Sequence, residues 1–173
     1  MWNNYKKIRR FMDKDSVEKI VGPAKCQIED RLLYYYGDGF FLAFTPRKFK
    51  IENLNREEYG EEGLYFLSVL HFSDIGFLKK YLRIDKFEAK DVKRFEDDIV
   101  TGYVNYMTSY SDVRKAYKRS GESTYYTEGE KRSLQGSEFV FSNLFIQWDP
   151  FIFFFAEKSN KSTISGFEYT PFE

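Results

Sequence analysis

The feature that most constrains this chain is a pair of short hydrophobic segments, each interrupted in its middle by turn-forming residues. The first is LLYYYGDGFFLAF, residues 32–44, and the second is LFIQWDPFIFFFA, residues 144–156. Aromatic and β-branched residues favour strands, and a Gly-Asp-Gly or Asp-Pro sequence between two such runs is typical of a tight turn. Each segment therefore predicts a β-hairpin.

The two hairpins can be aligned with each other. Leu32 falls on Leu144, Tyr36 falls on Trp148, and Gly37-Asp38 falls on Asp149-Pro150. A helical pattern precedes each hairpin, and a repeated order of elements indicates an internal duplication. We therefore predict an α+β fold: two tandem helix-then-antiparallel-strand units with a helical insert between them. The units and the insert cover residues 1–73, 74–107 and 108–173, as three parts or as one continuous globular domain.

Hydrophobic periodicity places the other elements. Helical spacing predicts five helices, at residues 2–12, 15–21, 74–82, 85–107 and 111–117. The expected N-caps are Asp15 or Ser16, Ser73 or Asp74, Asp85 and Ser111. Strand patterns occur at residues 32–36, 40–45, 49–54, 64–72, 138–141, 144–148, 151–156 and 163–169. Residues 55–63 read as a charged loop and 119–137 as a long loop or a ragged hairpin.

Composition narrows the class of protein. The chain has 27 Lys plus Arg and 27 Asp plus Glu, so it lacks the basic excess of a dedicated nucleic-acid binder. Its single cysteine, Cys26, excludes an internal disulfide and fits a reducing, cytoplasmic compartment. We expect no signal peptide, because no apolar run follows the basic start, and no membrane association, because no apolar stretch is long enough to span a bilayer.

The sequence offers few groups for catalysis. The lone histidine, His71, lies within an apolar strand pattern, where a packed polar role is commoner than catalysis. One Cys and one His cannot assemble a zinc site, and no phosphate-binding glycine motif is present. We therefore predict no catalytic residue, no metal and no cofactor. Carboxylates are plentiful, as in Glu96-Asp97-Asp98, and a metal-independent hydrolase that uses them is the third alternative.

Aromatic residues make up 20% of the chain, and they occur on both faces of the predicted strands. If the helices cover the face of Phe40, Leu42 and Phe44, and in the second unit the face of Ile152, Phe154 and Ala156, alternation sends a second set to the opposite face. Either the 74–107 insert covers that face or it remains open as a contact surface for another protein. The expected protein-binding residues are Leu33, Tyr35, Phe41, Phe145, Phe153 and Phe155.

Two basic clusters next to tyrosines suggest an alternative partner. Cations in such clusters can bind phosphates while tyrosines stack on bases, although they are equally typical of the solvated faces of amphipathic helices. The candidate nucleic-acid residues are Lys6, Arg9, Arg10, Arg114, Lys118 and Arg119.

The segments Val17–Pro23 and Leu33–Phe41, a short capped helix followed by an aromatic hairpin, form a pattern common in small bacterial proteins. The pattern resembles the helix-plus-hairpin repeat of the β-lactamase inhibitory proteins and the related outer-membrane-assembly lipoproteins. It also resembles small immunity-type proteins encoded beside secreted toxins. The chain departs from the secreted members because it lacks their disulfides and signal sequence, and because of its insert.

The resemblance implies a non-enzymatic inhibitor that uses a sheet face to bind another protein, such as a toxin or an enzyme. The alternative is a nucleic-acid-associated accessory protein of a phage or mobile element.

Overall fold

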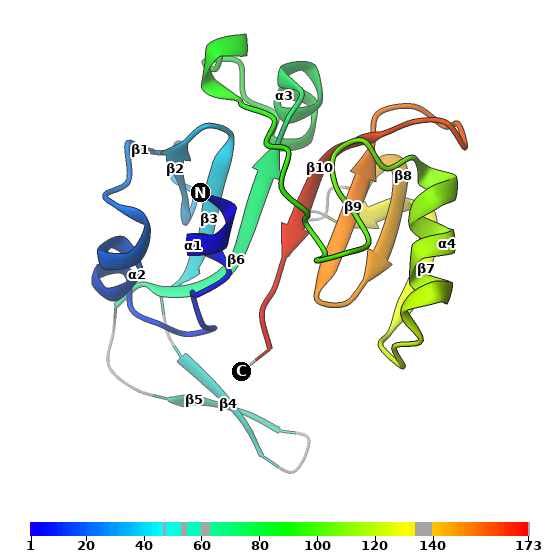
Figure 1. Ribbon diagram of the computed structural model, residues 1–173. Helices are drawn as coiled ribbons and strands as arrows, with labels where there is room; N and C mark the ends of the chain where they lie inside the picture. Colours follow the sequence, from blue (N-terminus) through cyan, green and yellow to red (C-terminus); the bar gives the residue numbers. More distant parts are fainter. Residues whose placement is uncertain (47, 53–54, 60–62, 134–139, 173) are drawn as a thin grey trace.

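The computed structural model describes the chain except residues 47, 53–54, 60–62, 134–139 and 173 (Figure 1). Its centre is one antiparallel sheet with the strand order β1-β2-β3-β6-β10-β9-β8-β7. These eight strands are β1 (Cys26–Gln27), β2 (Leu33–Gly37), β3 (Phe40–Thr45), β6 (Tyr65–Phe72), β7 (Tyr126–Ser133), β8 (Val140–Trp148), β9 (Phe151–Phe155) and β10 (Ile164–Tyr169). A separate ribbon pairs β4 (Lys48–Glu52) with β5 (Asn55–Tyr59).

The strand order has two halves. The first half runs β1, β2, β3 and β6, the second runs β10, β9, β8 and β7, and the last strands of the two halves, β6 and β10, pair in the middle. A helix directly precedes the first strand of each half: α2 (Lys14–Val21) comes before β1, and α4 (Tyr110–Ser120) comes before β7. The α+β class and the antiparallel sheet are therefore confirmed. That the halves are copies of one unit, and the division at residues 73 and 107, stay predictions.

Apolar side chains fill both faces of the sheet. One face packs against α1 (Trp2–Tyr5), α2, α4 and parts of residues 95–106, whose buried side chains form a single cluster. The other face packs against α3 (Ile75–Leu82) together with Ile84 and Phe87. Figure 1 shows α3 near the ends of the central strands β6 and β10, and α4 beside β7 and β8. The protein is thus a sheet between two unequal helical layers, and its aromatic residues supply much of both interfaces.

Most predicted strands agree with the structure, but β1 (Cys26–Gln27) was not predicted, and three other segments differ from their predictions. Residues 55–59 form β5, where we expected a charged loop. The predicted strands at 138–141 and 144–148 fall on one strand, β8 (Val140–Trp148), and residues 138–139 lie outside the described part. The 119–137 segment contains β7, which pairs antiparallel with β8 through a register shift near Gly129, and its residues 134–137 also lie outside the described part.

The prediction of a helix over residues 85–107 is wrong. Only a short 3-10 turn, η1 (Ala89–Asp91), forms there, and the chain then runs through bends and turns. The reason is that its apolar residues do not all face one way: Phe87 packs with α3, whereas Phe95 and Val104 belong to the cluster on the other face. A helix would keep these side chains on one stripe, whereas an extended backbone can pass from one face to the other.

The N-terminal helix is also shorter than predicted. Burial follows the expected pattern, with Trp2, Tyr5 and Ile8 all buried, but helix α1 ends at Tyr5. The backbone of Phe11 and Met12 instead pairs with Phe66 of β6, through N–H to O distances of 2.8 Å in both directions. These two hydrogen bonds replace those that a longer helix would make.

Candidate functional site

The structure does not leave the six predicted protein-binding residues exposed. Each has at most 8% of its surface accessible. They also do not share a face: four pack on the α3 side and two pack with α2 and α4. The α3-side residues are Leu33, Tyr35, Phe41 and Phe145, and the others are Phe153 and Phe155. The expectation of an open aromatic face is therefore wrong.

The error has a simple geometric cause. In the observed register Phe40 is paired with His71, His71 with Phe167, and Phe167 with Phe153, so these four residues form one row across the sheet. The sequence argument aligned Phe40 with Ile152 instead. A shift of one residue sends every side chain of a strand to the opposite face. Strand β9 was therefore assigned with its two faces exchanged, whereas Phe145 of β8 lies on the predicted side with Phe41.

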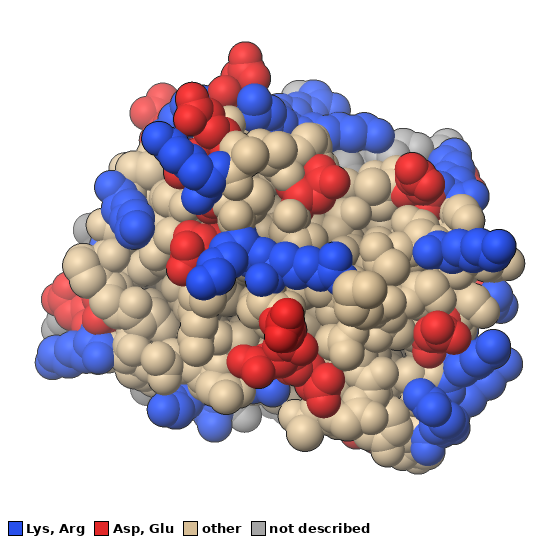
Figure 2. Space-filling model, turned by 45° about the horizontal axis from the view of Figure 1, so that its top comes forward, with Lys and Arg blue, Asp and Glu red and all other residues tan. Residues whose placement is uncertain are grey.

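The predicted nucleic-acid residues lie in two separate places. Lys6, Arg9 and Arg10 follow helix α1, where the Arg9 guanidinium donates to the Lys6 carbonyl at 3.0 Å and Arg10 lies over the ring of Phe11. The other three belong to α4, over the opposite half of the sheet. Figure 2 shows Lys and Arg dispersed among Asp and Glu on the face it displays. The six residues do not form one continuous basic patch.

His71 lies at the middle of the sheet and is completely buried. Its Nε2–H donates to the Asp38 carbonyl at 2.9 Å, because a carbonyl can only accept. Its Nδ1 is then the acceptor for the hydroxyl of Tyr106, which is also buried. Burial lowers the pKa of His71 to about 3 and raises the pKa of Tyr106 well above its usual value. Neither group reaches solvent, so the pair connects β6 to the 93–107 segment and has a structural role.

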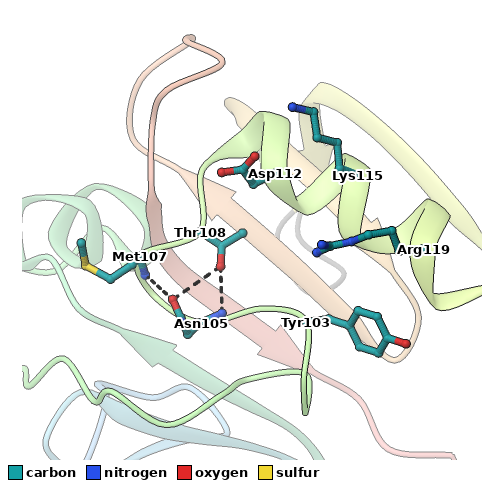
Figure 3. A pocket seen from close by; sticks show the side chains of 7 residues that line it. All are labelled: Tyr103, Asn105, Met107, Thr108, Asp112, Lys115 and Arg119. Carbon is teal, nitrogen blue, oxygen red and sulfur yellow. Dashed lines mark hydrogen bonds between the residues drawn. The ribbon is translucent and has the colours of Figure 1, made fainter.

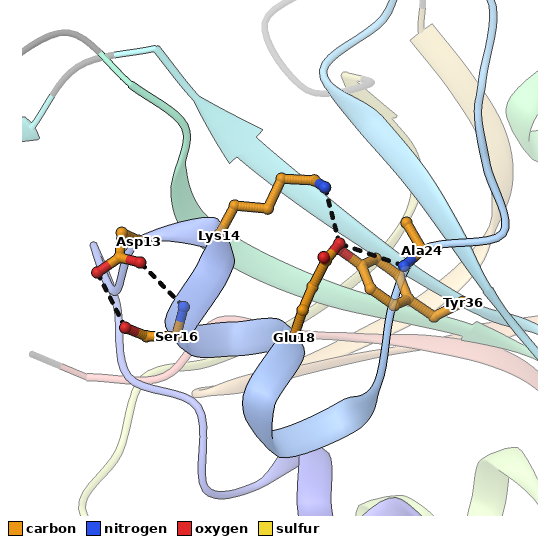
Figure 4. Close-up of polar contacts among 6 residues, drawn as sticks. All are labelled: Asp13, Lys14, Ser16, Glu18, Ala24 and Tyr36. Atoms are coloured by element: carbon orange, nitrogen blue, oxygen red, sulfur yellow. Dashed lines mark hydrogen bonds and ion pairs between the residues drawn. The ribbon is translucent and has the colours of Figure 1, made fainter.

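A second polar cluster fixes α2. One carboxylate oxygen of Glu18 accepts hydrogen bonds from Lys14 Nζ at 2.7 Å, Tyr36 Oη at 3.0 Å and the Ala24 N–H at 3.2 Å (Figure 4). Partial burial would raise the pKa of Glu18, but these hydrogen bonds outweigh it and lower the pKa. Three donors occupy this one oxygen, and the contact with Tyr36 anchors the helix to β2.

A pocket of about 390 Å³ lies between α4 and residues 103–108 (Figure 3). Its lining residues are Tyr103, Asn105, Met107, Thr108, Asp112, Lys115 and Arg119. Internal hydrogen bonds hold the 105–108 turn: the Asn105 N–H donates to Thr108 Oγ1 at 3.0 Å, the Met107 N–H donates to Asn105 Oδ1 at 2.8 Å, and the Thr108 N–H donates to the Asn105 carbonyl at 3.0 Å. The turn thus presents a fixed polar wall opposite the helix.

The cations of the pocket come from two consecutive turns of α4. Lys115 and Arg119 are four residues apart and so lie on one side of the helix. Figure 3 shows the Arg119 guanidinium directed into the space between α4 and the 105–108 turn. Among the described residues neither side chain, nor that of Lys118, has an ion pair or hydrogen bond, whereas Arg114 pairs with Glu128 at 3.1 Å. The pocket therefore holds positive charge that the described part of the chain does not neutralise.

Sequence reasoning identified Arg119 as part of a basic cluster but missed the pocket. The other wall of the pocket was assigned to the end of a helix, because Tyr103 and Tyr106 continue the apolar helical spacing of the preceding residues. A signal was present in the Gly102 and Thr108-Ser109 positions, because glycine and small polar residues are typical of turns. Gly102 has a positive φ of 79°, which marks the turn between Ile99 and Val104.

The described residues contain no cluster of three or more potential metal ligands, and no described helix has the length and hydropathy needed to traverse a bilayer. Cys26 is a free thiol. No known protein family matches the chain, and neither the curated proteins nor the solved structures contain a match to it.

Proposed function

We propose that this protein is a non-enzymatic binding protein of the inhibitor or immunity type, and that it contacts its protein partner through the outer side of α4. We define the α4 surface as Tyr103, Met107, Lys115, Lys118 and Arg119. The observation that carries the proposal is that this surface combines three cations without a described ion-pair partner with two exposed apolar side chains.

The exposed apolar residues support this location. In the described part of the chain, the large hydrophobic residues with at least about a third of their surface exposed are few: Met1, Leu32, Tyr103, Met107, Tyr125 and Phe172. Tyr103 and Met107 are 37% and 70% exposed, and both line the pocket. Tyrosine and methionine are enriched at protein interfaces, and central anchors of this kind contribute most of the binding energy.

The charge of the α4 surface favours an acidic partner. Opposite potentials accelerate encounter and select among partners more than they add affinity. The expected partner is therefore a protein with an acidic patch that includes a pocket or groove for the Tyr103 ring. The resemblance to inhibitory and immunity-type proteins favours the same class of function.

Nucleic acid is the second candidate, because α4 places Lys115, Lys118 and Arg119 near an exposed tyrosine. Two observations favour a protein partner. The net charge of the chain is zero, and the Glu96-Asp97-Asp98 run precedes the pocket wall in the same segment. A phosphate backbone would be repelled by these carboxylates, whereas a protein can present one local acidic patch.

The third alternative, a hydrolase that uses paired carboxylates, has less support. Retaining and inverting glycosidases both need two carboxyl groups that face one site. The pocket includes one carboxylate from the described residues, Asp112.

The product of the neighbouring gene is the first partner to test, because inhibitors are commonly encoded beside their targets. Binding should be measured by calorimetry for the wild-type chain and for Tyr103→Ala, Lys118→Ala and Lys19→Ala. We expect Tyr103→Ala to weaken binding at least about 30-fold, the loss of an interface anchor, and Lys118→Ala to slow association. Lys19→Ala is the matched control, an exposed cation on α2 away from the α4 surface.

Equal affinity of the Tyr103→Ala variant and the wild-type chain would contradict the proposed contact surface. Binding to a random-sequence oligonucleotide that falls steeply with salt, and falls further in the Lys118→Ala variant, would favour the nucleic-acid function instead.

A further inference from the structure

The geometry points to an anion-binding site in the pocket between α4 and residues 103–108: it takes a small oxyanion, a carboxylate or a phosphate, carried on a flat apolar group. The inference does not require the proposed protein partner, since the isolated chain contains all the groups involved. The first argument is the set of available donors. The guanidinium of Arg119 offers a planar fork that matches two oxygens of a carboxylate or phosphate.

Other groups of the pocket add positive charge or donors. Lys115 lines the pocket one helical turn before Arg119, and Figure 3 shows its ammonium group directed away from the Arg119 guanidinium, so it contributes long-range positive charge and no direct donor in this rotamer. The side-chain amide of Asn105 uses its oxygen to accept from the Met107 N–H, and no described residue accepts from its nitrogen. Arg94 lies beside the sulfur of Met107 at the same edge. The pocket thus presents more donors than acceptors, as an oxyanion requires.

The carboxylate of Asp112 limits where the anion can lie. Asp112 and Arg119 are seven residues apart on one helix, which separates their main-chain positions by about 10 Å along the axis. Figure 3 shows Asp112 at the far end of the helix from Arg119 and Tyr103. The anion therefore lies at the Arg119 end, and a neutral donor of the ligand, such as a hydroxyl or amide, faces Asp112.

The position of Tyr103 indicates that the ligand carries a flat apolar group. Its ring is 37% exposed, and its buried side packs edge-on against Trp148 at a centroid distance of 6.3 Å. Trp148 in turn contacts Tyr117 of α4 at 5.4 Å, so the ring of Tyr103 is supported from behind. An exposed ring held in this way is a platform on which a planar group can stack next to the guanidinium. A volume of about 390 Å³ accommodates a ligand of this size.

The test uses the purified chain and four probes: inorganic phosphate, adenosine monophosphate, adenosine and benzoate. Two-dimensional NMR of the ¹⁵N-labelled protein reports binding at the amides of residues 105–112, with helix α2 as the unaffected reference. We expect adenosine monophosphate or benzoate to shift these amides with a dissociation constant in the range of about 0.1–1 mM, and adenosine to bind at least tenfold more weakly than its monophosphate. A stronger response to benzoate than to the phosphates identifies a carboxylate ligand, and the reverse identifies a phosphate.

The variants separate a specific site from a general attraction to positive charge. Arg119→Ala should weaken binding at least tenfold, and Arg119→Lys should recover only part of it because the planar fork is lost. Lys19→Ala is the control, since Lys19 is an exposed cation on α2 that belongs neither to the pocket nor to the α4 surface. Equal losses in the Arg119→Ala and Lys19→Ala variants, or no shift at residues 105–112 with any probe at about 10 mM, would overturn the inference.

A failed titration would leave the proposed protein contact unaffected, because Tyr103 and Lys118 can contact a partner without a filled pocket. Conversely, loss of partner binding in the Tyr103→Ala variant would not by itself establish an anion site. The two experiments therefore fail independently.

Discussion

At the scale of single residues, the interior depends on polar groups that are satisfied in pairs. His71 is the sole histidine of the chain, and it is held neutral between the Asp38 carbonyl and the Tyr106 hydroxyl. Leaving either partner unpaired in the interior would cost about 1–3 kcal/mol. Close packing reinforces the arrangement: a Cβ on Gly39, next to Asp38, would lie 2.3 Å from the Phe72 carbonyl oxygen. This is why a histidine can occupy the centre of an apolar sheet.

The buried histidine makes stability depend on pH. Its folded pKa of about 3 lies below its value in the unfolded chain, about 6.5, so the unfolded state binds a proton first. Its contribution is present above about pH 6.5 and is lost as the pH falls toward 3. We expect the free energy of unfolding to decrease by up to about 1.4 kcal/mol per pH unit between pH 6 and 5, where carboxylates are still ionised. Urea unfolding at several pH values measures this slope.

The control is His71→Gln, which retains a donor and an acceptor but cannot titrate. Its unfolding free energy should be nearly constant over the same interval, even if the variant is less stable overall. A slope that persists in His71→Gln would show that another group is responsible. The imidazole signal of the wild-type protein should also show no titration above pH 5 in the folded state.

At the scale of elements, capping residues located the starts of α2, α3 and α4 to within a few residues, but no α-helix follows the predicted cap at Asp85, where burial on both faces of the sheet decides the backbone. Asp74, one of the two caps predicted for α3, accepts from the Phe77 N–H through its carboxylate at 2.8 Å. The cap of α4 is Ser109 instead of the predicted Ser111, and α2 is capped by Asp13. Neighbouring Ser and Asp residues can each serve as a cap, and the choice depends on where the preceding chain is anchored. Here the Tyr110 N–H donates to the Ser162 carbonyl and fixes that point.

The α4 cap can be tested with two serines. Ser109→Ala removes the acceptor for the Asp112 N–H, at 3.2 Å, and we expect it to lower the free energy of unfolding by about 1 kcal/mol. Ser111→Ala should change it by less than about 0.5 kcal/mol, because the Ser111 hydroxyl has no hydrogen bond in the described structure. Chemical denaturation of both variants measures the difference. A larger loss in Ser111→Ala would mean that the helix begins later, as the sequence alone suggested.

At the scale of the whole molecule, the sequence predicted most strands and the α+β class but not the packing of the two sheet faces. Alternation identifies which residues of one strand share a face, but not how separate strands are aligned, since that depends on the register across the central β6–β10 pair. The pocket was missed for a related reason, because it joins residues 103–108 to α4 only after the 85–107 segment is extended. Phe87 and Phe95 lie on opposite faces of the sheet, but their spacing in the sequence fits one stripe of a helix equally well. Periodicity alone therefore could not reveal the extended segment.

The packing of Trp2 predicts that the two halves unfold together. Its ring lies 5.0 Å from Phe167 and 5.5 Å from Tyr169, both on β10, and its Nε1–H donates to the Ile99 carbonyl at 3.4 Å. The N-terminal helix therefore depends on the C-terminal half of the sheet and on the segment between the halves. Trp148 lies on β8 in the other half of the sheet, where it contacts Tyr117 of α4. Because a shared interior couples both regions, we expect one cooperative transition.

The chain has two tryptophans, so Trp148→Phe and Trp2→Phe each retain one reporter. In each variant, urea unfolding followed by the fluorescence of the remaining tryptophan should give the same midpoint as far-ultraviolet circular dichroism. We expect both variants to be less stable than the wild-type chain, and Trp2→Phe to lose more because its ring joins the two halves. The test compares two probes within one variant, so it does not depend on this loss of stability. Separate midpoints for fluorescence and circular dichroism in either variant would show that residues 1–73 and 108–173 unfold as independent domains, because the shared sheet would then fail to couple them.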